Sequence, residues 1–216
     1  MGDENRLIIT YLTLRKLIGI LGIALPLILF FGALLIFQTG IQSSISSYYY
    51  TGMRDLFVGT ICVIGFFLLI YKGYETADNI AGDIGCLAAI GLALFPTAPD
   101  GVVTGTQQTI GYLHLGFAAL FFMVLIYFSL FLFTKTDPEK TPTPKKLQRN
   151  RVYRICGYTM AGCILLIAVY FMLPAEWAAL FTPYNPVYWL EAIVIIFFGI
   201  SWITKGEAIL KDENSG

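Results

Sequence analysis

The sequence predicts an all-α protein of the polytopic membrane class: a bundle of six transmembrane helices with both termini in the cytoplasm. The prediction depends on an apolar composition, on six apolar stretches near membrane-crossing length, and on an uneven distribution of Lys and Arg. Of the 216 residues, 57% are hydrophobic and 13% are charged. Soluble domains average about 25% charged residues, so this chain cannot build a water-facing surface. We expect one membrane domain over residues 1–216.

The six stretches follow one another along the chain. Lipid offers the backbone no hydrogen-bond partners, so a segment that crosses the membrane forms a helix of about 20 apolar residues. The first stretch is longer than the apolar region of a typical signal peptide and lacks a clear cleavage site, so we expect it to be retained. The six predicted helices span residues 17–37, 53–71, 80–95, 110–133, 152–173 and 187–204.

Two of the stretches have distinctive internal residues. Pro26 lies well inside the first one, where its missing N–H favours a kink. The third stretch is the shortest and carries small residues at four-residue spacing, at Ala81, Gly85, Ala89 and Ala93. Small residues let neighbouring backbones approach closely in a membrane, so we expect this helix to be central.

The connections between the stretches alternate between charged and nearly uncharged segments. Of the 14 Lys and Arg residues, all except Arg54 fall on one side of the predicted membrane. Basic residues accumulate on the cytoplasmic side, so the sequence predicts a multi-pass protein of the cell membrane with that side inside. The basic residues of this side are Arg6, Arg15, Lys16, Lys72, Lys135, Lys140, Lys145, Lys146, Arg149, Arg151, Arg154, Lys205 and Lys211.

Four ionisable residues lie at one level near the opposite, outer side. Arg54 and Asp55 begin the second stretch, while His114 and Glu191 lie about one turn into the fourth and sixth. An ionisable group at the centre of a membrane helix costs about 2.5 to 3.5 kcal/mol on insertion scales and less near its ends. Such residues are therefore typical of sites, although interfacial charges and a packing histidine are open alternatives.

Glu191 is the most informative of these residues, because the apolar run 192–200 follows it. A carboxylate there needs a partner, and Arg54 and His114 are the candidates that the sequence offers. If all four side chains meet, they supply an acid, a base and a cation. We therefore predict an outer-leaflet pocket formed by Arg54, Asp55, His114 and Glu191 that binds lipid or a small ligand.

Two other functions use some of the same residues. An intramembrane hydrolase would use His114 and Glu191, with Ser46, Ser47 or Thr51 as nucleophile, although the sequence contains no Gly-x-Ser-x-Gly motif. A proton-coupled transporter would use Asp83 and Glu191 as relay points. The sequence leaves open whether the protein is an enzyme.

Several classes of ligand are not predicted. One histidine and four cysteines without a close pair favour no metal site, and the chain carries no cofactor signature. The 14 basic and 14 acidic residues cancel, so no overall field attracts nucleic acid. The predicted partners are membrane lipids, and the basic run at 145–154 is open to two interpretations: ordinary cytoplasmic charge or recognition of anionic headgroups.

Residues 44–59, Ser-Ile-Ser-Ser-Tyr-Tyr-Tyr-Thr-Gly-Met-Arg-Asp-Leu-Phe-Val-Gly, are followed by Tyr-Lys-Gly-Tyr at 71–74. This pattern resembles a group of uncharacterised bacterial six-helix membrane proteins. It is more distantly similar to the superfamily of the damage-regulated autophagy modulators and the FGF-receptor-activating proteins, in which an acid stands at the position of Ser47. The resemblance implies six helices, cytoplasmic termini and a role linked to lipids.

Overall fold

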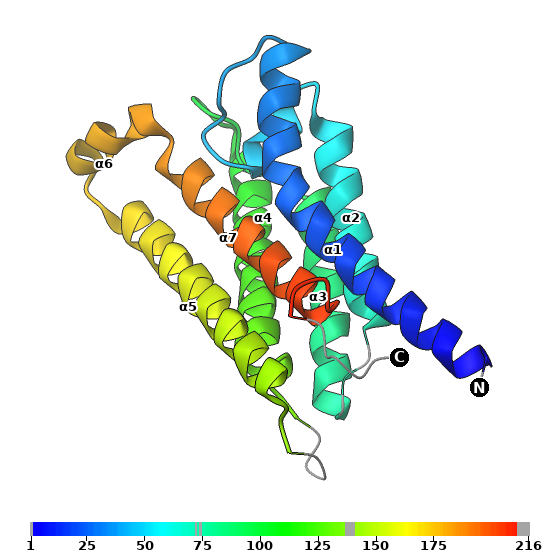
Figure 1. The fold of residues 1–216 in the computed structure, drawn as a ribbon. Helices are drawn as coiled ribbons and strands as arrows, with labels where there is room; N and C mark the ends of the chain where they lie inside the picture. The colour runs from blue at the N-terminus through cyan, green and yellow to red at the C-terminus, as the bar shows by residue number, and fades with distance from the viewer. Residues whose placement is uncertain (1, 72, 74, 137–140, 211–216) are drawn as a thin grey trace.

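A computed structural model describes residues 2–71, 73, 75–136 and 141–210, with side chains from Tyr11 onward. The chain is all-helical, and these residues contain no strand. Figure 1 shows the helices packed as one bundle. The long helices are α1 Gly2–Leu35, α2 Arg54–Ile70, α3 Thr76–Leu94, α4 Gly105–Tyr127, α5 Pro144–Met172 and α7 Pro186–Lys205. The short elements are 3₁₀ helices η1 Ser46–Tyr50 and η3 Thr182–Tyr184, π-helix η2 Phe128–Leu132 and helix α6 Ala175–Phe181.

In the described part of the chain, five helices are long and apolar enough to cross a membrane. These segments are Tyr11–Leu35, Thr76–Leu94, Gly105–Leu132, Pro144–Met172 and Pro186–Lys205. Helix α2 is also apolar but has 17 residues. At about 1.5 Å per residue it is about 25 Å long, slightly less than the roughly 30 Å of a bilayer core.

Most of the long helices begin earlier than the sequence predicts, and the difference is largest for α1 and α5. Helix α1 begins at Gly2, and α5 begins at Pro144. At the start of α5, the Thr143 hydroxyl accepts a hydrogen bond from the backbone N–H of Lys146 at 3.0 Å, and Pro144 occupies the first turn. Both features start helices in any solvent, whereas hydropathy detects only the part of a helix that suits lipid.

Close helix packing explains how the bundle is held together. Helix α1 packs on α7, α2 on α3, α3 on α4, and α5 on α7. A Cβ at Gly19 would lie 2.6 Å from the carbonyl oxygen of Gly199, and a Cβ at Gly199 would lie 2.5 Å from that of Gly19. The backbones of α1 and α7 are therefore in contact. The small residues predicted for the central helix, Ala81, Gly85, Ala89 and Ala93, are all buried in α3.

Pro26 does not end α1, which continues through it. Its carbonyl oxygen lies 3.4 Å from the hydroxyl of Tyr188 in α7, a donor from the neighbouring helix. Neighbouring side chains commonly satisfy backbone groups around a membrane proline. This contact adds to the packing of α1 on α7.

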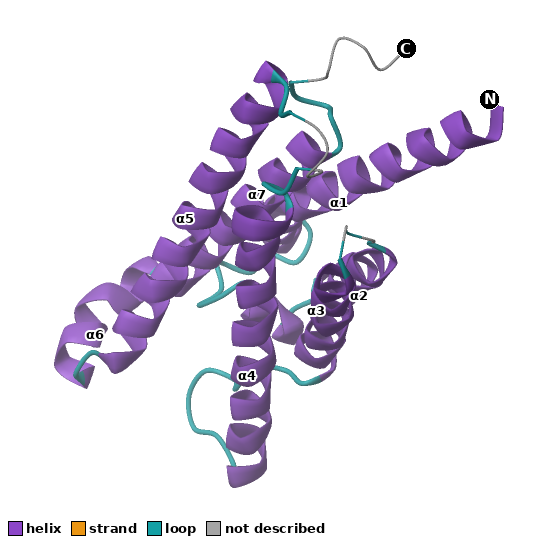
Figure 2. Ribbon diagram, turned by 90° about the horizontal axis from the view of Figure 1, so that it is seen from below, coloured by secondary structure: helices purple, strands orange, loops and turns teal. Residues whose placement is uncertain are grey.

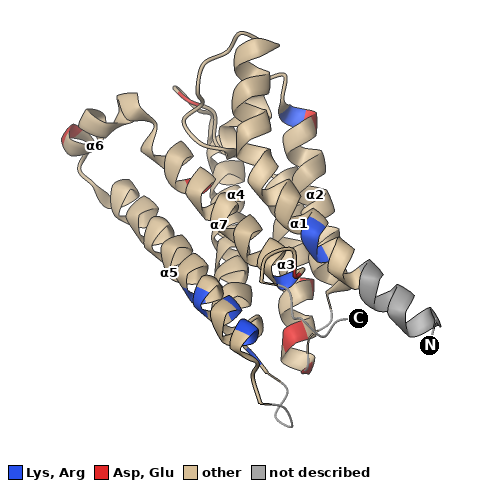
Figure 3. Cartoon of the chain, in the orientation of Figure 1, with Lys and Arg blue, Asp and Glu red and all other residues tan. Residues whose placement is uncertain are grey.

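The two ends of the bundle differ in their connections. We call the end with the α1–α2, α3–α4 and α5–α7 connections the upper end, and the end with the α2–α3 and η2–α5 connections the lower end, as drawn in Figure 1. Helices α4 and α5 are close at the lower end and diverge toward the upper end, in Figure 1 and in the perpendicular view of Figure 2. Figure 3 shows that the described Lys and Arg residues other than Arg54 lie toward the lower end. Arg6, Lys72, Lys140 and Lys211 lie outside the described side chains.

Candidate functional site

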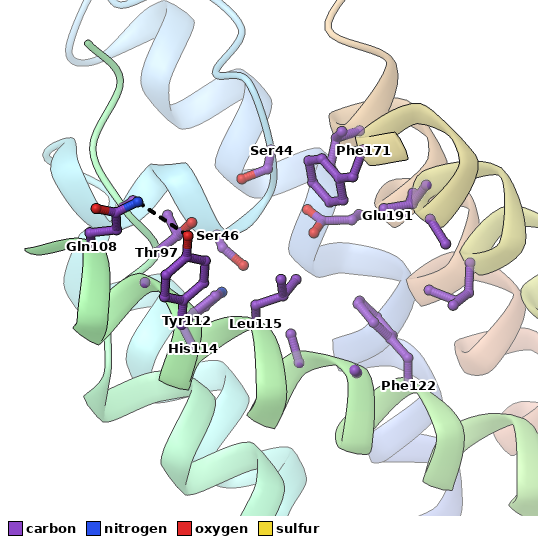
Figure 4. Close-up of a pocket in the computed structure, with 18 of the residues that line it drawn as sticks. Ser44, Ser46, Thr97, Gln108, Tyr112, His114, Leu115, Phe122, Phe171 and Glu191 are labelled. Atoms are coloured by element: carbon purple, nitrogen blue, oxygen red, sulfur yellow. Dashed lines mark hydrogen bonds between the residues drawn. The ribbon is translucent and has the colours of Figure 1, made fainter. Parts of the chain in front are cut away.

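A cavity of about 540 Å³ lies at the upper end, where α4 and α5 diverge. Its volume falls within the roughly 300 to 1,000 Å³ of small-molecule sites. The cavity is lined by α4, α5, the first two turns of α7, and the α1–α2 and α3–α4 connections. Small side chains at Ala118, Ala119 and Ala168 leave this space unfilled. Figure 4 shows the polar side chains near the loops, with Leu115 and Phe122 farther along α4.

Glu191 lines this cavity from the second turn of α7. The residue is only 8% exposed, and its Oε2 accepts a hydrogen bond of 2.7 Å from the backbone N–H of Ile45. A second contact lies close by, where the backbone N–H of Tyr188 donates to the carbonyl oxygen of Ser43 at 3.2 Å. Hydrogen bonds to a charged acceptor are among the stronger ones in proteins. Glu191 thus holds the α1–α2 connection against α7.

His114 lines the same cavity from α4 and is 5% exposed. Its Nδ1 lies 2.7 Å from the carbonyl oxygen of Phe95, at the end of α3. A carbonyl oxygen only accepts hydrogen bonds, so Nδ1 carries the proton, and Nε2 is the acceptor when the ring is neutral. The bond fixes the ring and ties α4 to the α3–α4 connection.

Arg54 and Asp55 lie apart from this cavity and are not among the residues that line it. Arg54 Nε lies 3.2 Å from Asp55 Oδ1, and their side chains are 56% and 91% exposed. The Arg54 guanidinium also lies 5.8 Å from the ring centre of Tyr49. Of the four residues that the sequence selects, the structure brings His114 and Glu191 together on one cavity and leaves Arg54 and Asp55 at the surface.

The hydrogen bond of Glu191 goes to a backbone N–H rather than to Arg54 or His114, the candidates that the sequence offers. Sequence reasoning considers Ser46 only as a nucleophile, and it misses the other polar lining residues, namely Ser44, Thr97, Gln108 and Tyr112. They lie in connections or in the first three turns of α4, where hydropathy does not show which residues face a cavity. Short polar residues beside aromatic ones in an uncharged loop are the only sequence signal for them.

Ser44, which lines the cavity, belongs to a group of three serines whose hydroxyls bond to one another. Ser47 Oγ lies 2.8 Å from Ser44 Oγ and 2.9 Å from Ser43 Oγ. The hydrogen bond of His114 goes to a carbonyl, and in the described part of the chain no hydroxyl is bonded to its ring. A general base that activates a nucleophile lies within hydrogen-bond reach of it. The described residues also contain no group of three His, Cys, Asp or Glu side chains that could hold a metal ion.

The acidic residues of α3 are arranged differently from the predicted relay. Asp83 is exposed, whereas Asp78 is 1% exposed and lies 2.6 Å from Lys135 Nζ. Below Glu191 in α7, Phe198 and Trp202 are fully buried in the core cluster. This apolar packing argues against a polar path that joins Asp83 to Glu191.

The fold and the cavity define a helical membrane protein with a potential binding site near one end of its bundle. Comparisons with models of protein families, with curated proteins and with solved structures found no match. The similarity to the six-helix family therefore stays a prediction.

Proposed function

We propose that this chain is a multi-pass protein of the cell membrane whose upper-end cavity binds an amphipathic ligand, such as a lipid of the outer leaflet. In this proposal α2 crosses the membrane as the sixth span, and the lower end faces the cytoplasm. The excess of basic residues at the lower end supports the orientation.

The observation that carries the proposal is the graded lining of the cavity. Hydroxyls, Gln108, His114 and Glu191 lie at one end, and apolar side chains of α4 and α5 line the rest. Leu115 and Phe171 line the cavity although they are 49% and 58% exposed. The cavity therefore opens on the side of the bundle, between α4 and α5, where acyl chains would lie. A ligand with a polar head and an apolar chain matches both parts.

Binding fits the site better than hydrolysis does. His114 and Glu191 are both engaged by backbone groups. Such contacts hold a cavity in shape. A hydrolase would require a hydroxyl or water beside His114 Nε2, and its turnover would fall in His114→Ala. Unchanged ligand binding in the same variant would leave the binding role intact.

Filling the cavity tests the proposal. Ala168 lines the cavity and is exposed, so Ala168→Trp occupies the space without displacing buried packing. Val169 is the next residue of α5, is 47% exposed and does not line the cavity, which makes Val169→Trp a matched control. In native mass spectrometry of protein purified in neutral detergent, we expect the wild type and Val169→Trp to retain a bound amphiphile and Ala168→Trp to lose it. Equal retention in all three would contradict a cavity ligand.

Cysteine labelling tests the orientation separately. In a background without the four native cysteines, Val102→Cys in the α3–α4 connection should react in intact cells with a membrane-impermeant maleimide. Gln148→Cys near the start of α5 should react only after permeabilisation. The reverse pattern would invert the proposed topology.

A further inference from the structure

A second cavity continues the first one toward the loops. It has a volume of about 290 Å³ and shares with the first cavity the residues Ser44, Thr97, Ala98, Phe171 and Val187. It is the more polar of the two and is bordered by the α1–α2 and α3–α4 connections and by the start of α7. The two spaces thus form one path from a polar entrance to an apolar interior, which we call the joined cavity.

The joined cavity has a one-sided charge. Asp100 lines the entrance and Glu191 lines the interior. Asp100 accepts hydrogen bonds from Ser43 Oγ, at 3.2 Å to Oδ1 and 3.3 Å to Oδ2. Among the described residues that line either space, none is Lys or Arg. Arg54 is the one Lys or Arg that the described part of the chain places at the upper end, and it is engaged with Asp55 and Tyr49.

This charge distribution discriminates between headgroups. Asp100 is exposed and Glu191 is buried. Near Glu191, away from bulk water, charges interact more strongly, and a buried charge without an opposite partner is costly. A phosphate or carboxylate headgroup would meet two carboxylates and no cation to pair with, other than a protonated His114. A protonated amine would gain a carboxylate partner at either level, and the hydroxyls and the aromatic faces of Tyr112 and Phe171 would add weaker contacts.

We propose that the joined cavity selects amphiphiles whose headgroup is a protonated amine, with the amine between Asp100 and Glu191 and the chain along α4 and α5. This inference rests on the proposed binding function and adds the class of ligand. A single-chain alkylamine is the simplest molecule with these properties.

The test uses probes that share one chain and differ in the head. Purified full-length protein in dodecyl maltoside at pH 8 binds radiolabelled dodecylamine, and unlabelled dodecylamine, dodecanol and dodecyl phosphate compete. At this pH an alkylamine is protonated, since aliphatic amines titrate near 10.4. We expect dodecylamine to compete at least about tenfold better than dodecanol, and dodecyl phosphate to compete least. Butylamine, which carries the head without the chain, should compete weakly.

Substitution of the two carboxylates is the second part of the experiment. Glu191→Gln keeps the side-chain size and an oxygen acceptor for the Ile45 N–H, and Asp100→Asn changes an exposed residue that does not threaten folding. Each should weaken dodecylamine competition and leave dodecanol unchanged. The matched control is Glu176→Gln, an exposed acid in α6 that lines neither space.

The outcomes separate the two proposals. Equal competition by amine, alcohol and phosphate would overturn the headgroup inference and leave a cavity that binds amphiphiles. Stronger competition by the phosphate would also overturn it. Equal potency of butylamine and dodecylamine would overturn the proposal that the ligand is amphipathic, and would indicate a water-soluble amine as the ligand. No saturable binding of any probe, with equal signals in wild type and Ala168→Trp, would overturn the proposed function as well.

Discussion

At the lower end of the bundle, the buried carboxylate of Asp78 meets an opposite charge and aromatic rings pack closely, whereas at the upper end the buried Glu191 and His114 face a cavity. Asp78 is paired with Lys135 at 2.6 Å. At the same end, the rings of Tyr71, Phe128, Phe133 and Trp202 pack with all centroid distances between 5.0 and 6.1 Å. At the upper end, Glu191 accepts a hydrogen bond from the backbone N–H of Ile45, and His114 donates one to the backbone carbonyl of Phe95. Both side chains line the cavity of about 540 Å³.

The surroundings of a polar residue within the bundle decide what that residue does. A paired charge in a filled region fixes one helix against the next, and its loss lowers stability. Polar side chains that are fixed by hydrogen bonds to backbone groups and that border a cavity remain accessible to a ligand in that cavity. The number of ionisable residues at each end does not make this distinction, because the lower end has more of them.

The largest expected effect comes from breaking the buried pair at the lower end. Among the described residues, Asp78→Ala leaves Lys135 with the more exposed Glu75 as its one acidic partner, at 3.2 Å. Breaking a buried pair costs roughly 3 to 5 kcal/mol, and we expect the low end, about 3 kcal/mol, because Lys135 keeps partial exposure. Chemical unfolding in detergent measures this loss. Asp83→Ala, an exposed acid of the same helix, is the control and should change the free energy of unfolding by less than about 0.5 kcal/mol.

Next in size is the loss of the Glu191 carboxylate at the upper end. Glu191→Ala leaves the Ile45 N–H without its acceptor, which costs about 1 to 3 kcal/mol for a buried group. Glu191→Gln retains an oxygen and should cost less. The same unfolding experiment compares the two variants. If both lose as much stability as Asp78→Ala, the two ends do not differ in the way that the structure indicates.

A smaller effect is the pH dependence of the lower-end pair. The hydrogen bond to Asp78 raises the pKa of Lys135 above its usual range, and Glu75 adds to this rise. Because the pKa of Lys135 is higher in the folded than in the unfolded protein, the ion pair contributes to the free energy of unfolding. This contribution is fully present below about pH 10.4, the unfolded pKa, and it disappears as the pH rises through the folded pKa. The stability difference between wild type and Lys135→Met should be constant from about pH 7 to 9 and shrink above about 10.4. A difference that grows with pH would contradict the ion pair.

The smallest effect is expected at the exposed pair of the upper end. Arg54→Ala removes an interaction between two exposed side chains, and such pairs contribute about 0 to 1 kcal/mol. We expect the melting temperature and dodecylamine binding to match those of the wild type. Loss of binding in this variant would indicate that Arg54 belongs to the binding site, as the sequence predicts.

The sequence predicts the helical core of this fold well, because a lipid-facing helix and a small-residue contact both leave strong local patterns. Five of the six predicted stretches coincide with helices that are long and apolar enough to cross a membrane. The polar first turns of α5 and the short α6 are missed, since neither is an apolar stretch of membrane length. They depend on local capping and on a Pro-bounded loop instead.

The site is predicted only in part, for a physical reason. His114 and Glu191 stand out because they interrupt apolar runs. Their partners, Phe95 and Ile45, act through backbone groups, which every residue has, so no side-chain pattern reveals them. Asp78 and Asp83 differ by five positions on one helix, and only the packing of α3 decides which of them is buried.

Photo-crosslinking shows whether an amphiphile occupies the upper-end cavity. Dodecylamine with a diazirine at the end of its chain, bound to the full-length protein and activated by light, reports which side chains the chain contacts. We predict adducts on the cavity-lining faces of residues 111–122 and 164–171, suppressed by excess dodecylamine and absent in Ala168→Trp. Adducts spread evenly over the exposed apolar helix faces, with no suppression and no effect of Ala168→Trp, would contradict a binding cavity at the upper end.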